Sequence, residues 1–358
     1  MVENVDEIRK PLTDWLAERW PERRCLRLGE LQSPKSGFSA QTIILPVGFE
    51  QGGEEATEKV VLRLENPEPA IYPLQAPGLD CEVEIQYKAM EALTKAGVVP
   101  LAPLIGYEDD AGVIGMPFYV MGFVDGEVPV EDPIYTKQGF FVDAKPEERG
   151  RLVEEGLRSL AAVHAVDWRS AGFEWLVPVG EEPSVERQLR LWEEYARREL
   201  DGRVHPGMDR ALDWLHANAA KTHEPALSWG DSRPGNIIWR DFQPLALTDF
   251  ENVAIAPPEF DLGWWLMFDR WSHETYGQDR LPGEPTREEQ VALYEQFSGR
   301  RIGDTIYYEV LGAFRYAAIV VRVMNRMVQR GMLASDQMLW LQNPAAVCLD
   351  QLLEVVDA

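Results

Sequence analysis

Two oxygen-bearing side chains near the middle of the chain, Asn236 and Asp249, have the types and spacing of a metal site. Residues 241–244 are predicted to form a four-residue turn, so that Arg240 pairs with Leu245 and the antiparallel register brings Asn236 opposite Asp249. Directly opposed residues have Cβ atoms about 5 Å apart, which lets an amide oxygen and a carboxylate share one cation. Ligands of this kind suit magnesium (Mg2+), so the pattern predicts a magnesium site.

A third residue, Asp231, precedes this hairpin by a tight loop, Ser232 to Gly235. The loop is predicted to hold Asp231 near the metal end of the hairpin, where its carboxylate can accept a proton from an incoming hydroxyl. Asp and Asn are also common turn residues, and the spacing of Asp231 and Asn236 alone is more often structural than catalytic. The strand, turn and second strand that follow, with Asp249 at the matching register, favour the catalytic interpretation.

The elements before this region predict a small β-rich lobe. Helical spacing of apolar residues from Ile8 to Leu16 is followed by strand-like runs and one amphipathic helix. The glycines at 52 and 53 indicate a hairpin loop. The predicted strands cover residues 26–31, 39–47, 59–65, 104–108 and 117–121, and the helix covers 79–96.

After Gly126 the pattern becomes that of long amphipathic helices, with clear strand signals only between Leu227 and Phe250. We therefore predict an α+β chain of two lobes, with residues 1–122 as the small β-rich lobe and 123–358 as the larger helical lobe that carries the predicted metal site. The predicted helices of the second lobe cover residues 146–167, 184–200, 208–219, 259–272, 287–297, 304–329 and 335–356.

Composition excludes several classes of partner. The chain has 60 acidic and 35 basic residues, a formal net charge of -25, so it would repel nucleic acid and anionic membrane surfaces. Its three cysteines are odd in number and far apart, which fits neither a disulfide framework nor a zinc site. The sequence has no apolar stretch typical of a signal peptide or a membrane span, so a cytoplasmic location is expected.

The chain resembles the aminoglycoside phosphotransferase-like family, in particular its acyl-CoA-dehydrogenase-associated and mycobacterial-type branches, which are distant relatives of protein kinases. Matching segments span nearly the whole chain, and the two most specific are the Leu160–Trp168 segment and the block from Trp229 to Glu251. The others are Ser36-Gly-Phe-Ser39, Val61-Leu-Arg63 and Pro117-Phe-Tyr-Val-Met121. The resemblance implies a protein-kinase-like two-lobed fold, in which residues 1–122 would be the nucleotide-binding lobe and residues 123–358 would carry the catalytic loop, the metal site and the substrate site.

The resemblance also implies roles for individual residues. Asp231 would be the catalytic base, and Asn236 and Asp249 would be the magnesium ligands. ATP would be bound by the phosphate loop, by a cation on the third strand and by the adenine-binding hinge, which correspond here to Ser36, Gly37, Phe38 and Ser39, to Arg63, and to Met121, Gly122 and Phe123.

Three positions depart from the family pattern. Trp229 replaces the His that usually precedes Gly-Asp, and packing is expected to substitute for it. Arg63 stands where kinases have a phosphate-binding lysine, with Lys59 as a nearby rival; an arginine can still donate two hydrogen bonds to phosphate. Gln86 takes the place of the helix glutamate that pairs with this cation, and Glu82 and Glu84 are alternatives.

Other polar and aromatic residues receive structural interpretations. His164 is predicted to be a hydrogen-bonded structural histidine, and Asp261 to anchor the catalytic loop rather than to contact substrate. The aromatic residues that follow Asp261 are expected mainly in the core, with a substrate pocket as the alternative: Trp264, Trp265, Phe268 and Trp271.

Taken together, the sequence predicts an ATP-dependent phosphotransferase that moves the γ-phosphoryl group of ATP-Mg to a hydroxyl of a small molecule, as a monomer or homodimer. Three acceptor classes stay open: an aminoglycoside-like cationic antibiotic, a hydroxyacyl thioester, and a sugar, choline-like or macrolide alcohol. The alternatives are a nucleotide-binding pseudokinase that acts as a scaffold and a metal-dependent hydrolase.

Overall fold

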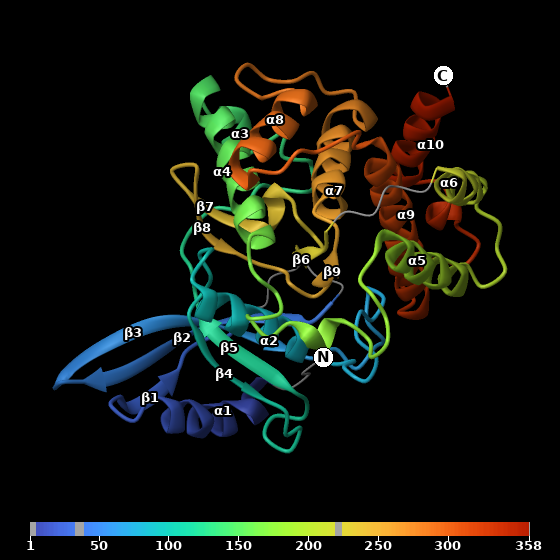
Figure 1. Cartoon of the computed structure of the whole chain (residues 1–358). Coiled ribbons are helices and arrows are strands. Elements are labelled where there is room, and N and C mark those ends of the chain that lie inside the picture. Colours follow the sequence, from blue (N-terminus) through green and yellow to red (C-terminus); the bar gives the residue numbers. More distant parts are fainter. Residues whose placement is uncertain (1–4, 33–38, 219–223, 358) are drawn as a thin grey trace.

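The computed structural model describes residues 5–32, 39–218 and 224–357. The chain has the α+β architecture expected from its sequence, with a sheet-based small lobe and a larger, mainly helical lobe (Figure 1). The last strand of the small-lobe sheet ends at Gly122. A division between the lobes at residue 123 remains our proposal.

The small lobe is built on a five-stranded antiparallel sheet with the strand order β1-β2-β3-β5-β4. Its longest pair, β2 with β3, runs from Gln41 opposite Leu64 to Gln51 opposite Glu54, and Gly52 and Gly53 close the hairpin with positive φ angles of 62° and 88°. The glycine prediction is therefore confirmed. The strands are β1 (Arg24–Leu28), β2 (Gln41–Gln51), β3 (Glu54–Leu64), β4 (Leu104–Glu108) and β5 (Phe118–Gly122).

Two helices flank this sheet. Helix α1 (Val5–Arg19) packs its apolar residues against the buried side chains of β2, which alternate along the strand as a one-sided sheet requires. Helix α2 (Glu82–Ala96) begins three residues later than predicted and ends at Gly97, which has the left-handed conformation typical of a helix C-cap. The long connection before α2, residues 65–81, reaches the large lobe.

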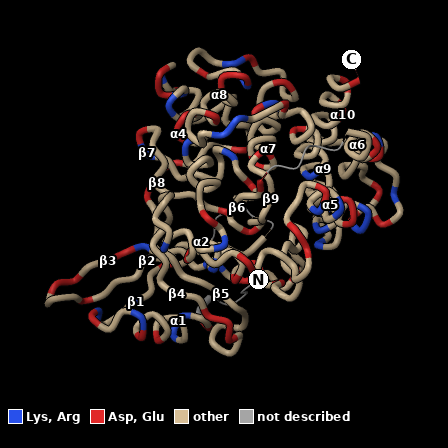
Figure 2. The backbone as a smooth tube through the Cα atoms, in the orientation of Figure 1, with Lys and Arg blue, Asp and Glu red and all other residues tan. Residues whose placement is uncertain are grey.

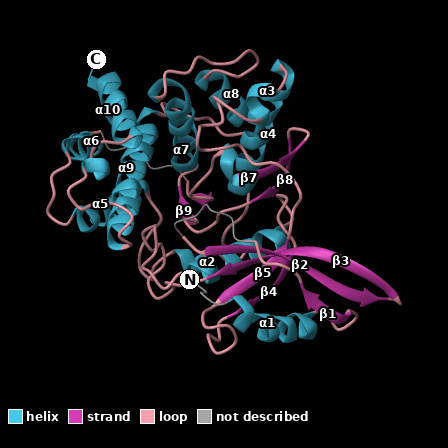
Figure 3. Cartoon of the chain, turned by 180° about the vertical axis from the view of Figure 1, so that it is seen from behind, coloured by secondary structure: helices cyan, strands magenta, loops and turns pink. Residues whose placement is uncertain are grey.

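The large lobe contains seven longer helices among the described residues, and Figure 3 shows them gathered on one side of the small-lobe sheet. They are α4 (Pro146–His164), α5 (Val185–Leu200), α6 (Pro206–Ala217), α7 (Glu259–Arg270), α8 (Arg287–Ser298), α9 (Ile306–Gln329) and α10 (Pro344–Asp357). Shorter helical turns are α3 (Phe140–Asp143), η1 (Glu174–Leu176), η2 (Pro234–Asn236), η3 (Trp271–Thr275) and η4 (Met338–Trp340).

Local signals explain why most helix starts were predictable. Ser184 caps α5 by accepting a hydrogen bond from the Arg187 N–H, and Thr286 with Glu289 forms a capping box at α8. The prediction of a helix from residue 335 was wrong. That helix begins at Pro344, because proline suits the first helical position and the Asn343 side chain accepts a hydrogen bond from the Ala346 N–H.

Helices α7 and α9 cross in the middle of the large lobe at two glycines. A Cβ atom built on Gly263 would lie 2.4 Å from the Tyr308 Cβ, and Gly312 lies against the Gly263 carbonyl. The two backbones therefore approach more closely than larger residues would allow. Around this contact lies one of the main apolar clusters, to which α5, α6 and α10 also contribute.

Two short antiparallel strand pairs lie between the helices of the large lobe: β6 (Ala226–Ser228) with β9 (Ala254–Ala256), and the hairpin of β7 (Ile237–Arg240) with β8 (Gln243–Leu247). The sequence prediction missed β9, because three small or apolar residues carry too little pattern to indicate a strand. These two pairs lie at the centre of the candidate site.

Acidic residues are spread over both lobes, and Figure 2 shows them also near the tip of the β2–β3 hairpin; around α5, acidic and basic residues lie together. All three cysteines lie in the described part of the chain and are free thiols. Within residues 5–32, 39–218 and 224–357, no helix combines the length and apolar character needed to cross a bilayer.

Candidate active site

The hairpin of β7 and β8 differs in register from the prediction. Its turn has two residues, Asp241 and Phe242, both with positive φ (53° and 60°), so Arg240 pairs with Gln243. A bulge follows between Ile238 and Trp239. The prediction of a four-residue turn was wrong because both turn residues adopt the left-handed conformation, which non-glycine residues rarely do.

As a consequence, Asn236 lies opposite Thr248 and not opposite Asp249. The Thr248 N–H donates to the Asn236 carbonyl at 2.9 Å, and the Thr248 hydroxyl donates to the same oxygen at 3.0 Å. A one-residue shift alone would send Asp249 to the other face of the hairpin. Asp249 itself has a φ of 65°, so the chain changes direction there, and Asp249 lines the same cavity as Asp231.

This cavity has a volume of about 500 Å³ and lies beneath the small lobe, between the catalytic-loop region and α7 and α9. Three carboxylates from the central segment line it: Asp231, Asp249 and Glu251. Burial raises the pKa of Asp249, and the positive charge of Arg63 acts in the opposite direction. One part of the cavity wall therefore carries three carboxylates, and the charge of Arg63 acts on one of them, Asp249.

Asp231 is buried, with 3% of its surface exposed, and its two oxygens differ in their partners. Oδ1 accepts hydrogen bonds from Trp264 Nε1 at 2.9 Å and from Arg233 Nε at 3.1 Å. Oδ2 accepts one from the Tyr72 hydroxyl at 3.2 Å. A carboxylate held in this way is oriented for contact with a ligand through Oδ2.

Asn236 is tied to the same loop. Its Nδ2 donates to the Asp231 carbonyl at 2.8 Å, and Trp239 Nε1 donates to the Pro234 carbonyl at 3.0 Å. Because the nitrogen of the amide is used inside the loop, the amide oxygen Oδ1 is the atom of Asn236 able to ligate a cation. The structure thus places Asp231 and Asp249 on one cavity and ties Asn236 to the loop of Asp231, but Asn236 is not among the residues that line this cavity.

Asp261 at the start of α7 anchors the loop before Asp231, as predicted. Its carboxylate accepts hydrogen bonds from Ser228 Oγ (2.8 Å), the Trp229 N–H (2.6 Å) and the Gly230 N–H (3.0 Å). It also lies 3.0 Å from Nε2 of His164. Burial alone would raise the pKa of Asp261, but the His164 and Ser228 hydrogen bonds outweigh it and hold the pKa below its ordinary value.

His164 has the structural role expected from the sequence. Its Nδ1 lies 2.7 Å from the Tyr294 hydroxyl while Nε2 faces Asp261, so both ring nitrogens are used inside the core. Trp229 occupies the position of the family histidine and packs as predicted. It is fully buried, stacks on Phe250, and donates from Nε1 to the Thr248 carbonyl at 2.8 Å.

Gly230 and Arg315 complete the support of the loop. Gly230 has a φ of 89°, and a Cβ atom there would lie 2.0 Å from the Asn252 carbonyl oxygen, so only glycine fits. Arg315 Nη2 donates to the Gly230 carbonyl at 2.9 Å, and its guanidinium lies 3.8 Å from the Phe260 ring centre and 4.3 Å from that of Trp264. Burial lowers the pKa of Arg315 to about 10.

Arg63 on β3 is hydrogen-bonded to Thr42 and Gln86. Its Nη1 donates to Thr42 Oγ1 at 2.6 Å, across the strand pair, and its Nη2 donates to Gln86 Oε1 at 3.3 Å. Burial works against the charge of Arg63, but Tyr119, Asp249 and Glu251 outweigh it and raise its pKa. The rival Lys59 lies over the Phe123 ring instead.

The two alternatives to Gln86 have other partners. Glu82 accepts a hydrogen bond from the Ile71 N–H at 3.1 Å, and Glu84 lies 3.9 Å from Lys88 at a half-exposed position. Among the three predicted partners of Arg63, Gln86 is therefore the one whose side chain accepts a hydrogen bond from the guanidinium.

Glu251 is a site residue that the sequence prediction missed. It lines the cavity, and Gln86 Nε2 donates to its Oε2 at 3.4 Å, so Gln86 bridges Glu251 and Arg63. Burial and the neighbouring charges of Asp249 and Glu82 raise the pKa of Glu251 well above its ordinary value. The available signal was its position two residues after Asp249, which alone does not distinguish a site residue from a surface carboxylate.

The predicted nucleotide-binding residues are only partly described. Ser36, Gly37 and Phe38 lie outside the described residues, whereas Ser39 lines the cavity. In the predicted hinge, the Gly122 N–H donates to the Pro103 carbonyl at 2.7 Å and the Phe123 N–H to the Lys59 carbonyl at 3.1 Å. Adenine recognition by Met121 to Phe123 stays a prediction. In this conformation, the N–H groups of Gly122 and Phe123 are already used within the protein, so adenine would bind to other atoms of this segment.

The aromatic residues of α7 and η3 belong to both the core and the cavity wall. Trp264 and Trp265 are buried, as the core interpretation requires, yet Trp264, Trp265, Phe268 and Trp271 all line the cavity. Tyr316 of α9 packs on the Phe268 ring with 4.9 Å between centres and extends the wall. These aromatic residues can therefore be part of the core and line the cavity at the same time.

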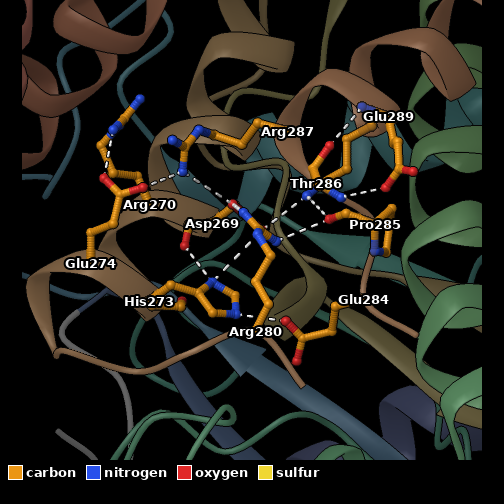
Figure 4. A network of polar contacts seen from close by, with 12 residues as sticks. Asp269, Arg270, His273, Glu274, Arg280, Glu284, Pro285, Thr286, Arg287 and Glu289 are labelled. Atoms are coloured by element: carbon orange, nitrogen blue, oxygen red, sulfur yellow. Dashed lines mark hydrogen bonds and ion pairs between the residues drawn. The ribbon is translucent and has the colours of Figure 1, made fainter. Parts of the chain in front are cut away.

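A polar network fixes the far end of this wall (Figure 4). Asp269 of α7 lines the cavity and accepts hydrogen bonds from both guanidinium nitrogens of Arg280 and from Gln290 Nε2. His273 Nε2 lies 2.7 Å from Glu284 Oε2, while its Nδ1 lies 2.8 Å from the Asp269 carbonyl. The network ties the connection between η3 and α8 to α7.

The oxygen donors of the site fit a magnesium ion shared with phosphate groups. Among the described residues, no three His, Cys, Asp or Glu side chains form a metal site by themselves. Magnesium, however, keeps several waters and is usually bound by one or two carboxylates together with substrate phosphates. Asp249, with its carboxylate in the cavity, and Asn236, with its amide oxygen, match this donor set.

Comparisons with known proteins identify the family of this chain. The chain matches the model of the Phosphotransferase enzyme family over residues 50–294, more than half of its length. It is 30% identical over 257 residues to acyl-CoA dehydrogenase family member 11 of Gallus gallus, covering 66% of this chain and 31% of that protein. The chain thus spans about a third of the length of that relative.

Solved structures show the same fold over nearly the whole chain. A Ralstonia eutropha protein provisionally named an aminoglycoside phosphotransferase is 26% identical, with a TM-score of 0.69 and coverage of 97% of this chain and 98% of that one. Macrolide 2'-phosphotransferase MphH of Brachybacterium faecium, at 15% identity, has a TM-score of 0.55 and coverage of 95% and 97%. This chain has the two-lobed fold of the kinase-like phosphotransferases, and it belongs to the Phosphotransferase enzyme family.

Proposed function

We propose that the protein transfers the γ-phosphoryl group of ATP-Mg to a hydroxyl of a small molecule. The observation that supports this most directly is that Asp231 and Asp249 line one cavity, with the positive charge of Arg63 of the small lobe acting on Asp249. A base, a metal-binding carboxylate and a phosphate-binding cation are the parts that phosphoryl transfer requires.

Each residue has a role in this proposal. Asp231 accepts the proton of the acceptor hydroxyl at Oδ2, since Oδ1 already accepts two N–H donors. Asn236 and Asp249 would hold the magnesium ion, which neutralises charge on the phosphate oxygens when it is bound. Arg63 offers a guanidinium to the phosphates, and Gln86 with Thr42 fixes its orientation.

The cavity favours an acceptor with an apolar body over a polycationic one. Its walls are largely aromatic and aliphatic, from α7, η3 and α9. Two of the acidic wall residues are already paired, Glu131 with Arg233 and Asp269 with Arg280, so neither is left to bind an ammonium group. We therefore propose an apolar alcohol, a class that includes hydroxyacyl thioesters and macrolides, rather than an aminoglycoside.

The test is an ATP-consumption screen against alcohols of the three classes, run with Asp231→Ala and Asp249→Ala beside the wild type. Asp213→Ala, at an exposed position of α6, is the matched control. We expect turnover that depends on an apolar alcohol, is lost in both site variants, and is retained in the control.

Three other results would contradict the proposal in different ways. Turnover unaffected by Asp231→Ala would reject the base. ATP binding without turnover for any acceptor would indicate a pseudokinase. Phosphate release that no acceptor changes would indicate a hydrolase.

A further inference from the structure

The connection between β3 and α2 docks on the large lobe. We call residues 66–80 of this connection the strap; Figures 1 and 3 show it beneath α5 and α9. The Tyr195 hydroxyl of α5 donates to the Ile71 carbonyl, and Arg187 Nη2, also of α5, donates to the Gln75 carbonyl at 2.7 Å. These two contacts hold the strap on either side of Tyr72.

Helix α9 holds the beginning of the strap. Arg322 Nη2 donates to the Pro69 carbonyl at 2.6 Å, and the Glu68 carboxylate pairs with Arg326 at 2.8 Å and with Arg330 at 2.9 Å. The strap is therefore held in place by the large lobe, although it precedes α2 in the sequence. Its position relative to the catalytic loop is fixed by buried and half-buried contacts.

Tyr72 is the strap residue that reaches the catalytic loop. Its hydroxyl donates to Asp231 Oδ2 at 3.2 Å, across 159 positions of sequence. Oδ1 of the same carboxylate already accepts hydrogen bonds from Trp264 and Arg233. An acceptor hydroxyl must also approach Oδ2, because that is the oxygen with unused capacity, so the phenol oxygen and the acceptor oxygen compete for one oxygen of the base.

We propose that Tyr72 prevents water from acting as the phosphoryl acceptor. Its hydroxyl occupies the position of the acceptor hydroxyl on Asp231 until an alcohol acceptor displaces it. This inference rests on the proposed phosphotransferase function. Without Tyr72, a water molecule at Oδ2 could attack the γ-phosphorus. A bond from the water oxygen to phosphorus would form, the bond to the ADP oxygen would break, and Asp231 would take the water proton before releasing it to solvent.

Displacement by an acceptor is possible because the contact is weak. A hydroxyl that donates to a carboxylate in a strong hydrogen bond lies at about 2.5 to 2.7 Å, and Tyr72 is farther away. An alcohol with an apolar body gains binding energy on the aromatic wall and can use it to displace the phenol. Water has no apolar body and gains no binding energy on the aromatic wall, so it cannot displace the phenol of Tyr72.

The test uses water as the probe acceptor and Tyr72→Phe as the variant, which removes one oxygen and keeps the ring. We expect ATP hydrolysis without added acceptor to rise about tenfold in Tyr72→Phe, which is below the roughly 100- to 10,000-fold contribution of a general base because Asp231 is present in both proteins. Adding Asp231→Asn to Tyr72→Phe should abolish the gain. Tyr87→Phe, which also removes a small-lobe phenol, is the control and should hydrolyse ATP at the wild-type rate.

A crystal structure of Tyr72→Phe gives a readout that does not depend on activity. We expect an ordered water within hydrogen-bond distance of Asp231 Oδ2, at the former phenol oxygen position. An unchanged or slower hydrolysis rate, or a Tyr72→Phe structure without that water, would overturn the inference. The proposed function fails separately, if the wild type neither binds ATP-Mg nor transfers phosphate to any alcohol.

Discussion

The carboxylate of Asp261 accepts a 2.6 Å hydrogen bond from the backbone N–H of Trp229, a residue 32 positions earlier in the chain. With the neighbouring bonds from Ser228 and Gly230, it fixes the backbone that leads directly to Asp231. The first turn of α7 thus sets the position of the proposed base. The buried carboxylate of Asp261 thus fixes this loop, a role that backbone hydrogen bonds have within a helix or a sheet.

Asp261→Asn is therefore expected to reduce both stability and activity. An amide can accept on one atom only, so at least one buried loop N–H loses its acceptor, at a cost of about 2 to 4 kcal/mol. Urea unfolding of the variant measures this directly. Glu354→Gln, an exposed carboxylate on α10, should change the free energy of unfolding by less than about 0.5 kcal/mol; equal stabilities for the two variants would contradict the anchor role.

His273 should make stability depend on pH. Burial alone would lower its pKa, but the hydrogen bond to Glu284 and the charge of Asp269 outweigh it and raise the pKa above the ordinary 6.5. The protonated form is thus favoured in the folded state. Its contribution is fully present below the unfolded pKa and is lost as pH rises through the folded pKa.

His273→Gln should consequently lower the free energy of unfolding at about pH 6 and do so less at about pH 9. The measurement is urea unfolding of both proteins at the two pH values. His216→Gln, at an exposed position on α6, serves as the control and should show little change at either pH. A difference between His273→Gln and wild type that grows with pH would have the wrong sign for this account.

Gly263→Ala tests the close crossing of α7 and α9. The added Cβ would lie 2.4 Å from the Tyr308 Cβ, so the helices must separate, with a loss of about 2 to 3 kcal/mol in the free energy of unfolding. Gly303→Ala is the matched control, since a Cβ there meets nothing within 4 Å and its φ is not positive. Similar melting temperatures for the two variants would show that the crossing tolerates a methyl group.

The sequence predicted those parts of the site that depend on local signals. The segment from Trp229 to Glu251 indicated Asp231, Asn236 and Asp249, and capping residues indicated most helix starts. The hairpin register could not be predicted correctly, because it depends on left-handed conformations at Asp241 and Phe242 that these residue types seldom adopt.

Contacts between distant segments were also beyond prediction. Tyr72 lies in a Pro-rich connection with no periodic pattern, and its contact with Asp231 exists only because α5 and α9 hold the strap. The contact of Gln86 with Glu251 likewise joins a helix and a loop, whereas Gln86 was already one of the candidate partners of Arg63. Tertiary packing creates such pairs, and a single sequence does not record them.

The central claim, that Asp249 binds magnesium with ATP while Asp231 acts on the acceptor, is tested most directly by calorimetric titration of ATP with and without Mg2+. In the wild type we expect Mg2+ to tighten ATP binding, and in Asp249→Asn we expect this gain to fall by at least about tenfold. Asp231→Asn should keep the full gain while losing phosphoryl transfer. An Asp249→Asn protein that binds ATP with the full dependence on Mg2+ would contradict the account.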